Sequence, residues 1–196
     1  MLSMLAFAVV SCLGTSDKKE ESNTDDSETV ANVDPSDFRK ESALGLYEIS
    51  VPDYMKSTTG LNADASMQFQ NIFKETYLAI IEEPKQDFID TFEELGEYDS
   101  SKSPAMNYQE IQMSYFTEGM SVNKLTDPKN MKLNGLDAEQ VELSGRVPGI
   151  DFDIFYLMTF AEGEDTLYMI MEWTLKSRED DYKETFEYMA TTFREL

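Results

Sequence analysis

The sequence contains no histidine and a single cysteine among its 196 residues. Without histidine, a histidine-based catalytic triad, a histidine general base and a histidine metal ligand are all excluded. One cysteine excludes an internal disulfide and a zinc site built from several cysteines. Basic residues are also scarce, since 16 Lys and Arg face 39 Asp and Glu, and the net charge is −23. A surface of that sign repels phosphate backbones, so we expect no nucleic acid as a partner.

A short apolar segment opens the sequence and ends at the cysteine. Residues 1–11 are too few for a membrane-spanning helix, which needs about 20 apolar residues, and their length suits a secretory signal. The step Val9-Val10-Ser11-Cys12 resembles the lipobox of bacterial lipoproteins. That resemblance implies cleavage before Cys12, whose thiol then carries a diacylglycerol. Neither Lys nor Arg precedes Cys12, and a start codon further upstream would account for this departure from the usual signal.

A polar segment, residues 12–37, separates the cysteine from the expected domain. Residues 13–37 hold eight acids, two lysines and no aromatic residue, so they cannot bury enough apolar surface to offset their ordering entropy. We expect a disordered acidic tether with a mean reach of roughly 30 Å. Residues 18–21 resemble the export signal of some surface lipoproteins, but the match is short and displaced from the cysteine, so a charged linker is the simpler interpretation. From the lipobox resemblance we expect a lipid-anchored protein of the cell envelope. We favour the outer membrane, and the sequence leaves open whether the domain lies on its periplasmic or its surface side.

Residues 38–196 are predicted to form a single α+β domain. Period-two alternation over residues 152–160 and 167–175, around an acidic turn at 163–165, predicts an antiparallel hairpin. Helical spacing places Tyr182, Phe186, Met189 and Phe193 on one stripe of a last helix within residues 178–196, which should pack on the sheet. Other patterns predict strands near 46–52, 66–73, 77–81 and 139–147, and helices near 88–95 and 108–116. This order predicts an antiparallel sheet flanked by helices.

Several short phrases give this domain a resemblance to PsbP-like domains over about residues 43–196. They are the hairpin Ile150–Trp173, the phrase Trp173-Thr174-Leu175, the phrase Asn134-Gly135-Leu136, and the terminal helix with Phe186, Met189 and Phe193. The resemblance implies an αβα sandwich. The family includes lipoproteins of unknown role, as well as photosystem accessory subunits and a nuclear import factor that act by binding proteins. The resemblance implies no shared catalytic residues. Because the sequence also lacks histidine and a glycine-rich phosphate loop, we expect neither an enzyme nor a cofactor.

Five carboxylates are candidate ligands for a cation: Asp151, Asp153, Glu162, Glu164 and Asp165. Asp151 and Asp153 are two residues apart and should share one strand face, and the other three cluster at the hairpin turn. A hard cation needs several oxygen ligands at about 2.3–2.6 Å, which a turn and a strand face could supply. The simpler interpretation is a solvated acidic face, and we predict no metal site. In the same way, five tyrosines could line a groove or fill the core: Tyr47, Tyr54, Tyr77, Tyr98 and Tyr108.

Three functions remain open from the sequence, with Cys12 as the one predicted modification site. The first is a non-catalytic interaction module that a lipid anchor holds near an envelope protein. The alternative is a lipoprotein that binds a small molecule or a cation between sheet and helices. A third is a glycan or ester hydrolase that uses paired carboxylates. The partner, the ligand and the oligomeric state are not defined by the sequence.

Overall fold

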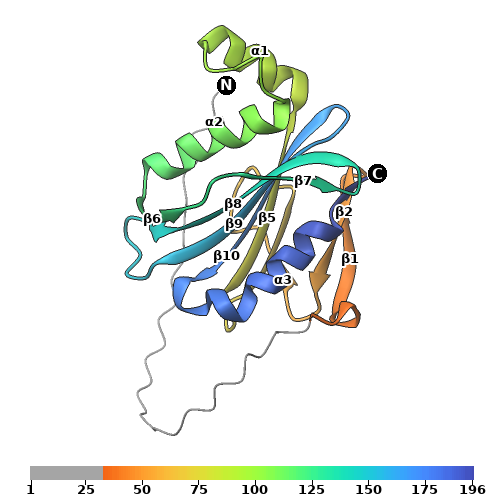
Figure 1. Cartoon of the computed structure of the whole chain (residues 1–196). Coiled ribbons are helices and arrows are strands. Elements are labelled where there is room, and N and C mark those ends of the chain that lie inside the picture. The colour runs from red at the N-terminus through yellow and green to blue at the C-terminus, as the bar shows by residue number, and fades with distance from the viewer. Residues whose placement is uncertain (1–32) are drawn as a thin grey trace, which may run out of the picture.

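The computed structural model describes residues 33–196 of the chain (Figure 1). The predicted signal segment, the lipidation site Cys12 and most of the predicted tether lie outside the described residues. Within residues 33–196, no helix is both long enough and apolar enough to cross a membrane.

The described residues form three α-helices, eleven strands and two short 3-10 helices, η1 and η2. Their order along the chain is η1 Pro35–Asp37, β1 Phe38–Ala43, β2 Tyr47–Pro52, β3 Lys56–Ser57, β4 Met67–Asn71, β5 Thr76–Pro84, α1 Lys85–Leu95, α2 Pro104–Glu118, β6 Ser121–Leu125, β7 Lys129–Leu133, β8 Leu136–Arg146, β9 Ile154–Glu162, β10 Thr166–Leu175, η2 Lys176–Arg178, α3 Glu179–Thr192 and β11 Arg194–Glu195.

The strands form two antiparallel sheets. The large sheet has the order β3-β4-β5-β10-β9-β8-β6, and β7 also pairs with β8. Its centre is the predicted hairpin of β9 and β10, in which Met171 lies opposite Met158 on one side and Ala79 of β5 on the other. The small sheet has the order β1-β2-β11.

Both faces of the large sheet are covered. Helices α1 and α2 pack on one face, and α3 with the small sheet packs on the other, so the domain has three layers (Figure 1). The predicted stripe of α3 is confirmed, because Tyr182, Phe186, Met189 and Phe193 all belong to the core between α3 and the large sheet. The prediction of an antiparallel sheet flanked by helices is therefore confirmed.

The ends of α1 and α2 follow local sequence signals. Helix α1 stops at Gly96, which adopts φ 74° and donates its backbone N–H to the Glu93 carbonyl, a conformation that glycine tolerates best. Helix α2 begins after Ser103, whose hydroxyl accepts a hydrogen bond from the Met106 N–H at 3.2 Å. Pro104 occupies the first helical turn, where its missing N–H costs nothing.

Three details differ from the sequence predictions. The last helix ends at Thr192 rather than near residue 196, because Phe193 is extended and Arg194–Glu195 pairs with β2 as strand β11. The hairpin begins at Ile154, so Phe152 lies in the preceding loop and is exposed instead of facing the core. The strand expected near 46–52 is present as β2, but its partners β1 and β11 in the small sheet and the strands β6 and β7 were not predicted.

Candidate functional site

The five carboxylates proposed as cation ligands do not come together in the structure. Strand β9 has nine residues, and at about 3.3 Å per residue its two ends lie roughly 30 Å apart. Asp151 and Asp153 precede β9, whereas Glu162, Glu164 and Asp165 lie at its far end. The expectation that Asp151 and Asp153 share a strand face is wrong, because residues 151–153 form a bend and not a strand.

Two of these carboxylates already have cationic or amide partners. Glu162 pairs with Lys85 at the start of α1, with the Lys85 Nζ 3.4 Å from its carboxylate. The Asp153 carboxylate accepts hydrogen bonds at 2.9 Å from the Arg146 Nε and from the Asn123 side chain. Within residues 33–196, no group of three or more Cys, Asp or Glu side chains is placed to hold a metal ion. Glu162 and Asp153 therefore bind neighbouring side chains at the two ends of the hairpin.

The tyrosines considered for a groove are dispersed. Tyr47 and Tyr108 are fully buried, and they belong to the two different cores on opposite faces of the large sheet. Tyr77 stacks on Trp173, with the ring centroids 5.3 Å apart. Tyr54 alone of these residues borders a surface hollow. The five side chains therefore do not line one groove.

The surface of the described residues includes two shallow depressions that are the best candidates for a binding site. The first, of about 340 Å³, lies between the small sheet and α3 and is lined by Val33, Asp34, Asp37, Phe38, Pro52, Asp53, Tyr54 and Thr185. The second, of about 580 Å³, lies where α2 and β8 end and is lined by residues 118–121 and 146–151. Both are open to solvent. A small-molecule site is usually an enclosed, mainly apolar cleft with a few convergent polar groups, and neither depression has that form.

A buried polar group beneath α3 was not foreseen from the sequence. Alternation along β10 turns Tyr168, Ile170, Glu172 and Thr174 toward α3, while the intervening residues face α2. Glu172 is 0% exposed, and neither of its carboxylate oxygens has a hydrogen-bond partner among the described residues. The buried hydroxyl of Thr174 lacks one as well.

Apolar neighbours surround Glu172. On the adjacent strands it lies opposite Leu78 and Leu157. Burial, with a contribution from the negative charge of Glu187, raises the pKa of the Glu172 carboxyl well above its ordinary value of 4.5. The structure thus favours the neutral, protonated form. A shifted carboxyl pKa is a frequent mark of functional sites, but this side chain has no exposed surface with which to meet a substrate.

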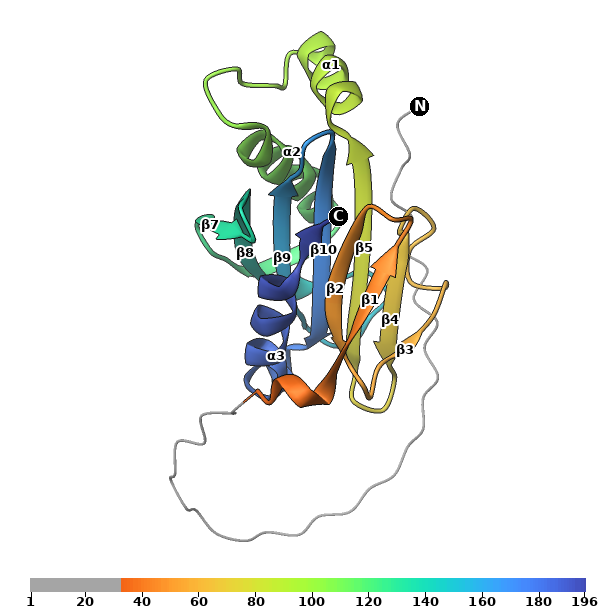
Figure 2. The same ribbon diagram turned by 90° about the vertical axis from the view of Figure 1, so that its right-hand side faces the viewer.

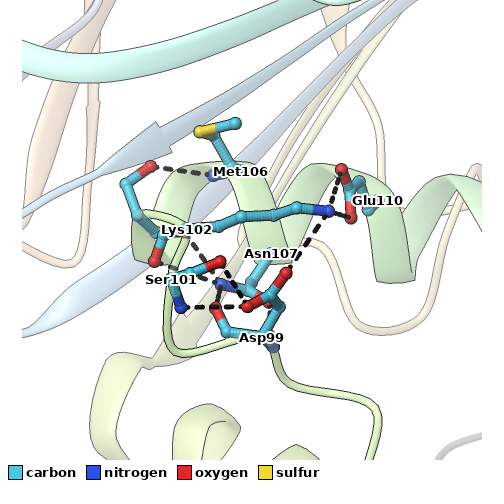
Figure 3. A network of polar contacts seen from close by, with 7 residues as sticks. Asp99, Ser101, Lys102, Met106, Asn107 and Glu110 are labelled. Atoms are coloured by element: carbon cyan, nitrogen blue, oxygen red, sulfur yellow. Dashed lines mark hydrogen bonds and ion pairs between the residues drawn. The ribbon is translucent and has the colours of Figure 1, made fainter.

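A polar network fixes the connection between α1 and α2 (Figure 3). The buried Asn107 side chain accepts a hydrogen bond from the Asp99 N–H at 2.7 Å and donates one to the Asp99 carbonyl at 2.9 Å. The Asp99 carboxylate accepts two hydrogen bonds from Ser101, which lower the pKa of Asp99. Lys102 pairs with Glu110 at 2.6 Å. The polar groups of this network are hydrogen-bond or ion-pair partners of one another, so the network fixes the conformation of the loop between α1 and α2.

An antiparallel sheet with α1 and α2 on one face and α3 on the other defines the PsbP-like fold. The solution structure of cyanobacterial PsbP (CyanoP) from Synechocystis sp. PCC 6803 is similar, with a TM-score of 0.57 at 14% sequence identity. The match covers 87% of this chain and 98% of that chain.

Other solved structures resemble the chain less well. A crystal structure from Bacteroides thetaiotaomicron VPI-5482 gives a TM-score of 0.50 at 13% identity, and the match covers 82% of this chain and 49% of that chain. The Saccharomyces cerevisiae Ran-binding protein Mog1p gives 0.48 at 8% identity, over 80% of this chain and 94% of that chain. No family model and no curated protein sequence matches the chain. At these identities the comparisons show the fold alone.

Proposed function

We propose that the protein is a lipid-anchored component of the bacterial cell envelope whose PsbP-like domain is a non-catalytic protein-interaction module. The observation that carries the proposal is the sequence Val9-Val10-Ser11-Cys12, followed at once by a polar stretch that leads to the domain. A diacylglycerol on the Cys12 thiol supplies two acyl chains, and two chains hold a protein stably on a membrane. We place the anchor in the outer membrane.

The chemistry of the described residues supports binding over catalysis. Paired carboxylates for glycoside hydrolysis lie within roughly 5–10 Å of each other across a substrate, so a carboxylate at one end of β9 cannot pair with one at the other end. Glu172, the carboxyl with the most raised pKa, is enclosed. The chain carries a net charge of −23, so we expect the partner to be an envelope protein with a basic docking surface.

Two measurements on intact cells test the proposal. Labelled palmitate should be incorporated into the wild-type chain and not into Cys12→Ala, and equal labelling of both would remove the anchor. Photo-cross-linking from exposed positions of the domain should recover one reproducible envelope protein, and Cys12→Ala should lose that product because the domain is no longer held at the membrane. A hydrolase would instead turn over substrates in a panel of glycans and esters.

A role in binding a small molecule or a cation is the alternative, and one observation favours it. The side-chain oxygens of Glu172 and Thr174 lack hydrogen-bond partners among the described residues. Both residues are fully buried, so a small ligand that satisfies them must enter the core between β10 and α3. Native mass spectrometry of the full chain separates the two functions. A bound ligand adds a discrete mass that disappears in Glu172→Met, whereas the interaction module gives the bare mass of the chain.

A further inference from the structure

The turn between β4 and β5 projects two apolar side chains into solvent. Phe73 is the most exposed large apolar residue of the described chain, at 89%, and its neighbour Ile72 is 54% exposed. The turn has a defined conformation, because the Asn71 side-chain oxygen accepts hydrogen bonds from the Phe73 N–H at 3.0 Å and from the Lys74 N–H at 2.9 Å. We call Ile72 and Phe73 the apolar tip.

Contacts from two other elements hold the apolar tip in place. Arg178, just before α3, donates a hydrogen bond from its Nη1 to the Lys74 carbonyl at 3.0 Å. On the other side, the Asn71 side chain donates to the Tyr54 carbonyl at 2.8 Å, and the Lys74 Nζ lies 5.0 Å from the centre of the Tyr54 ring. The tip is therefore a supported projection of the domain.

The apolar tip lies at the end of the domain where the described chain begins. Tyr54, which contacts Asn71 and Lys74 on either side of the tip, lines the same depression as Val33 and Asp34. Figure 2 shows the first described residues, the start of α3 and the β4–β5 turn together at the lower end of the domain. Cys12 precedes Val33 by 21 residues, so an anchor on Cys12 would join the domain at this end, through a link with a mean reach of roughly 25 Å.

We propose that the apolar tip inserts into the interfacial region of the phospholipid bilayer that carries the anchor, an inference that rests on the lipidation proposed above. Exposed aromatic and aliphatic side chains beside an anchor suit the boundary between headgroups and acyl chains. The anchor makes the contact intramolecular, and short linkers give effective concentrations on the order of millimolar, so two side chains suffice for a contact that would be negligible from solution.

The charges around the tip define which bilayer it fits. Lys74 and Arg178 flank the tip, but the nearby acids Glu75, Glu179, Asp180 and Asp181, together with Asp34 and Asp37 near the start of the described chain, outnumber them. The contact is therefore apolar and not electrostatic, so it should form on zwitterionic lipid and weaken as anionic lipid is added. A basic membrane-binding surface would show the opposite dependence.

Tryptophan quenching by brominated lipid tests the insertion. The acylated full chain is reconstituted in zwitterionic phosphatidylcholine vesicles with brominated acyl chains, in a Trp173→Phe background that removes the chain's one native tryptophan. Phe73→Trp is compared with Leu95→Trp, because Leu95 is also exposed, at 54%, and ends α1 at the opposite end of the domain (Figure 2). We expect emission at position 73 to shift to the blue and fall about two-fold or more, with position 95 unchanged.

The outcomes separate this inference from the proposed function. If the chain binds the vesicles and both probes respond equally, or neither responds, the tip does not insert and the anchor stands. If the acylated chain stays in the aqueous phase, the anchor and the insertion both fail. Ile72→Trp provides a second probe in the same turn. If Phe73→Trp fails to fold, quenching at position 72 tests the insertion of the tip instead.

Discussion

The Tyr168 hydroxyl donates a hydrogen bond of 2.9 Å to the Glu195 carboxylate and so joins β10 to the C-terminal strand β11. The second oxygen of that carboxylate accepts the Glu164 N–H at 2.9 Å. The neighbouring residue, Arg194, pairs with Glu48 of β2 at 2.7 Å. One dipeptide therefore connects the small sheet, the central hairpin and the end of α3.

Gly163 leaves room for this connection, since a methyl group at Gly163 would overlap the Glu195 carboxylate, which would then have to move away from its hydrogen-bond donors Tyr168 and Glu164. We predict that Gly163→Ala lowers the free energy of unfolding by about 1–3 kcal/mol, the usual cost of overpacking. Urea denaturation of the full chain, followed by circular dichroism, measures the change.

A matched glycine provides the control for that prediction. Gly119 ends α2 at φ −92°, and an added methyl group there meets no atom within 4 Å, so Gly119→Ala should change stability by less than about 0.5 kcal/mol. In the background of Glu195→Ala, the cost of Gly163→Ala should shrink. An unchanged cost would show that the overlap with Glu195 is not its cause.

The buried Glu172 carboxyl makes the stability of the fold depend on pH. Burial raises the pKa of Glu172 in the folded state above the ordinary 4.5. The free energy of unfolding is therefore highest below about pH 4.5, where Glu172 is protonated in both the folded and the unfolded state. It falls as the pH rises toward the raised pKa, by at most about 1.4 kcal/mol per pH unit. We predict that Glu172→Gln, which cannot titrate, becomes steadily more stable relative to wild type as the pH rises from 4.5 toward the raised pKa of Glu172. Melting temperatures of both chains across that range measure the difference.

An exposed carboxylate supplies the comparison for Glu172. Glu164→Gln removes a negative charge from a solvent-exposed turn and should show no comparable pH-dependent gain. Glu172→Met, which replaces the buried carboxyl by an apolar side chain of similar size, should raise stability at pH 7 by about 1–3 kcal/mol. Parallel pH profiles for wild type and Glu172→Gln would mean that Glu172 is charged in the folded state.

The Asn107 side chain should determine the order of the loop between α1 and α2. We predict that Asn107→Ala lowers the free energy of unfolding by about 1–3 kcal/mol, because the Asp99 backbone N–H and carbonyl lose their partner. Hydrogen exchange at residues 97–103 should accelerate. Lys102→Ala, which breaks a more exposed ion pair of the same network, should cost less than about 1 kcal/mol, and equal losses in the two variants would contradict a central role for Asn107.

Much of the large sheet and its helices could be predicted because the signals are local. Gly96 marks the end of α1, Ser103 and Pro104 mark the start of α2, and the hairpin repeats its apolar residues with period two. In the small sheet only β2 was predicted, within residues 46–52, and the two strands that pair with it have no such signal. Strand β1 has the sequence Phe-Arg-Lys-Glu-Ser-Ala, which does not alternate apolar and polar residues. Strand β11 pairs Arg194 with Glu48 of β2, far away in the sequence. Only the folded chain brings these strands together.

The candidate site was less predictable than the fold. Spacing along the chain placed Asp153 and Glu162 near one hairpin. In the structure the whole length of β9 lies between these two residues, so their side chains cannot share a ligand. Glu172 did carry a signal, because it is the one charged residue in the run from Leu167 to Leu175. Period two assigned its neighbours Met171 and Trp173 to one face, and the opposite face becomes a core only once α3 and the small sheet cover it.

Mass spectrometry of the mature protein extracted from cell membranes tests the central claim most directly. The account predicts that residues 1–11 are absent, that Cys12 is the N-terminal residue, and that the Cys12 thiol carries a diacylglycerol. A chain that retains residues 1–11, bears an unmodified Cys12 and is recovered from the aqueous fraction would contradict it.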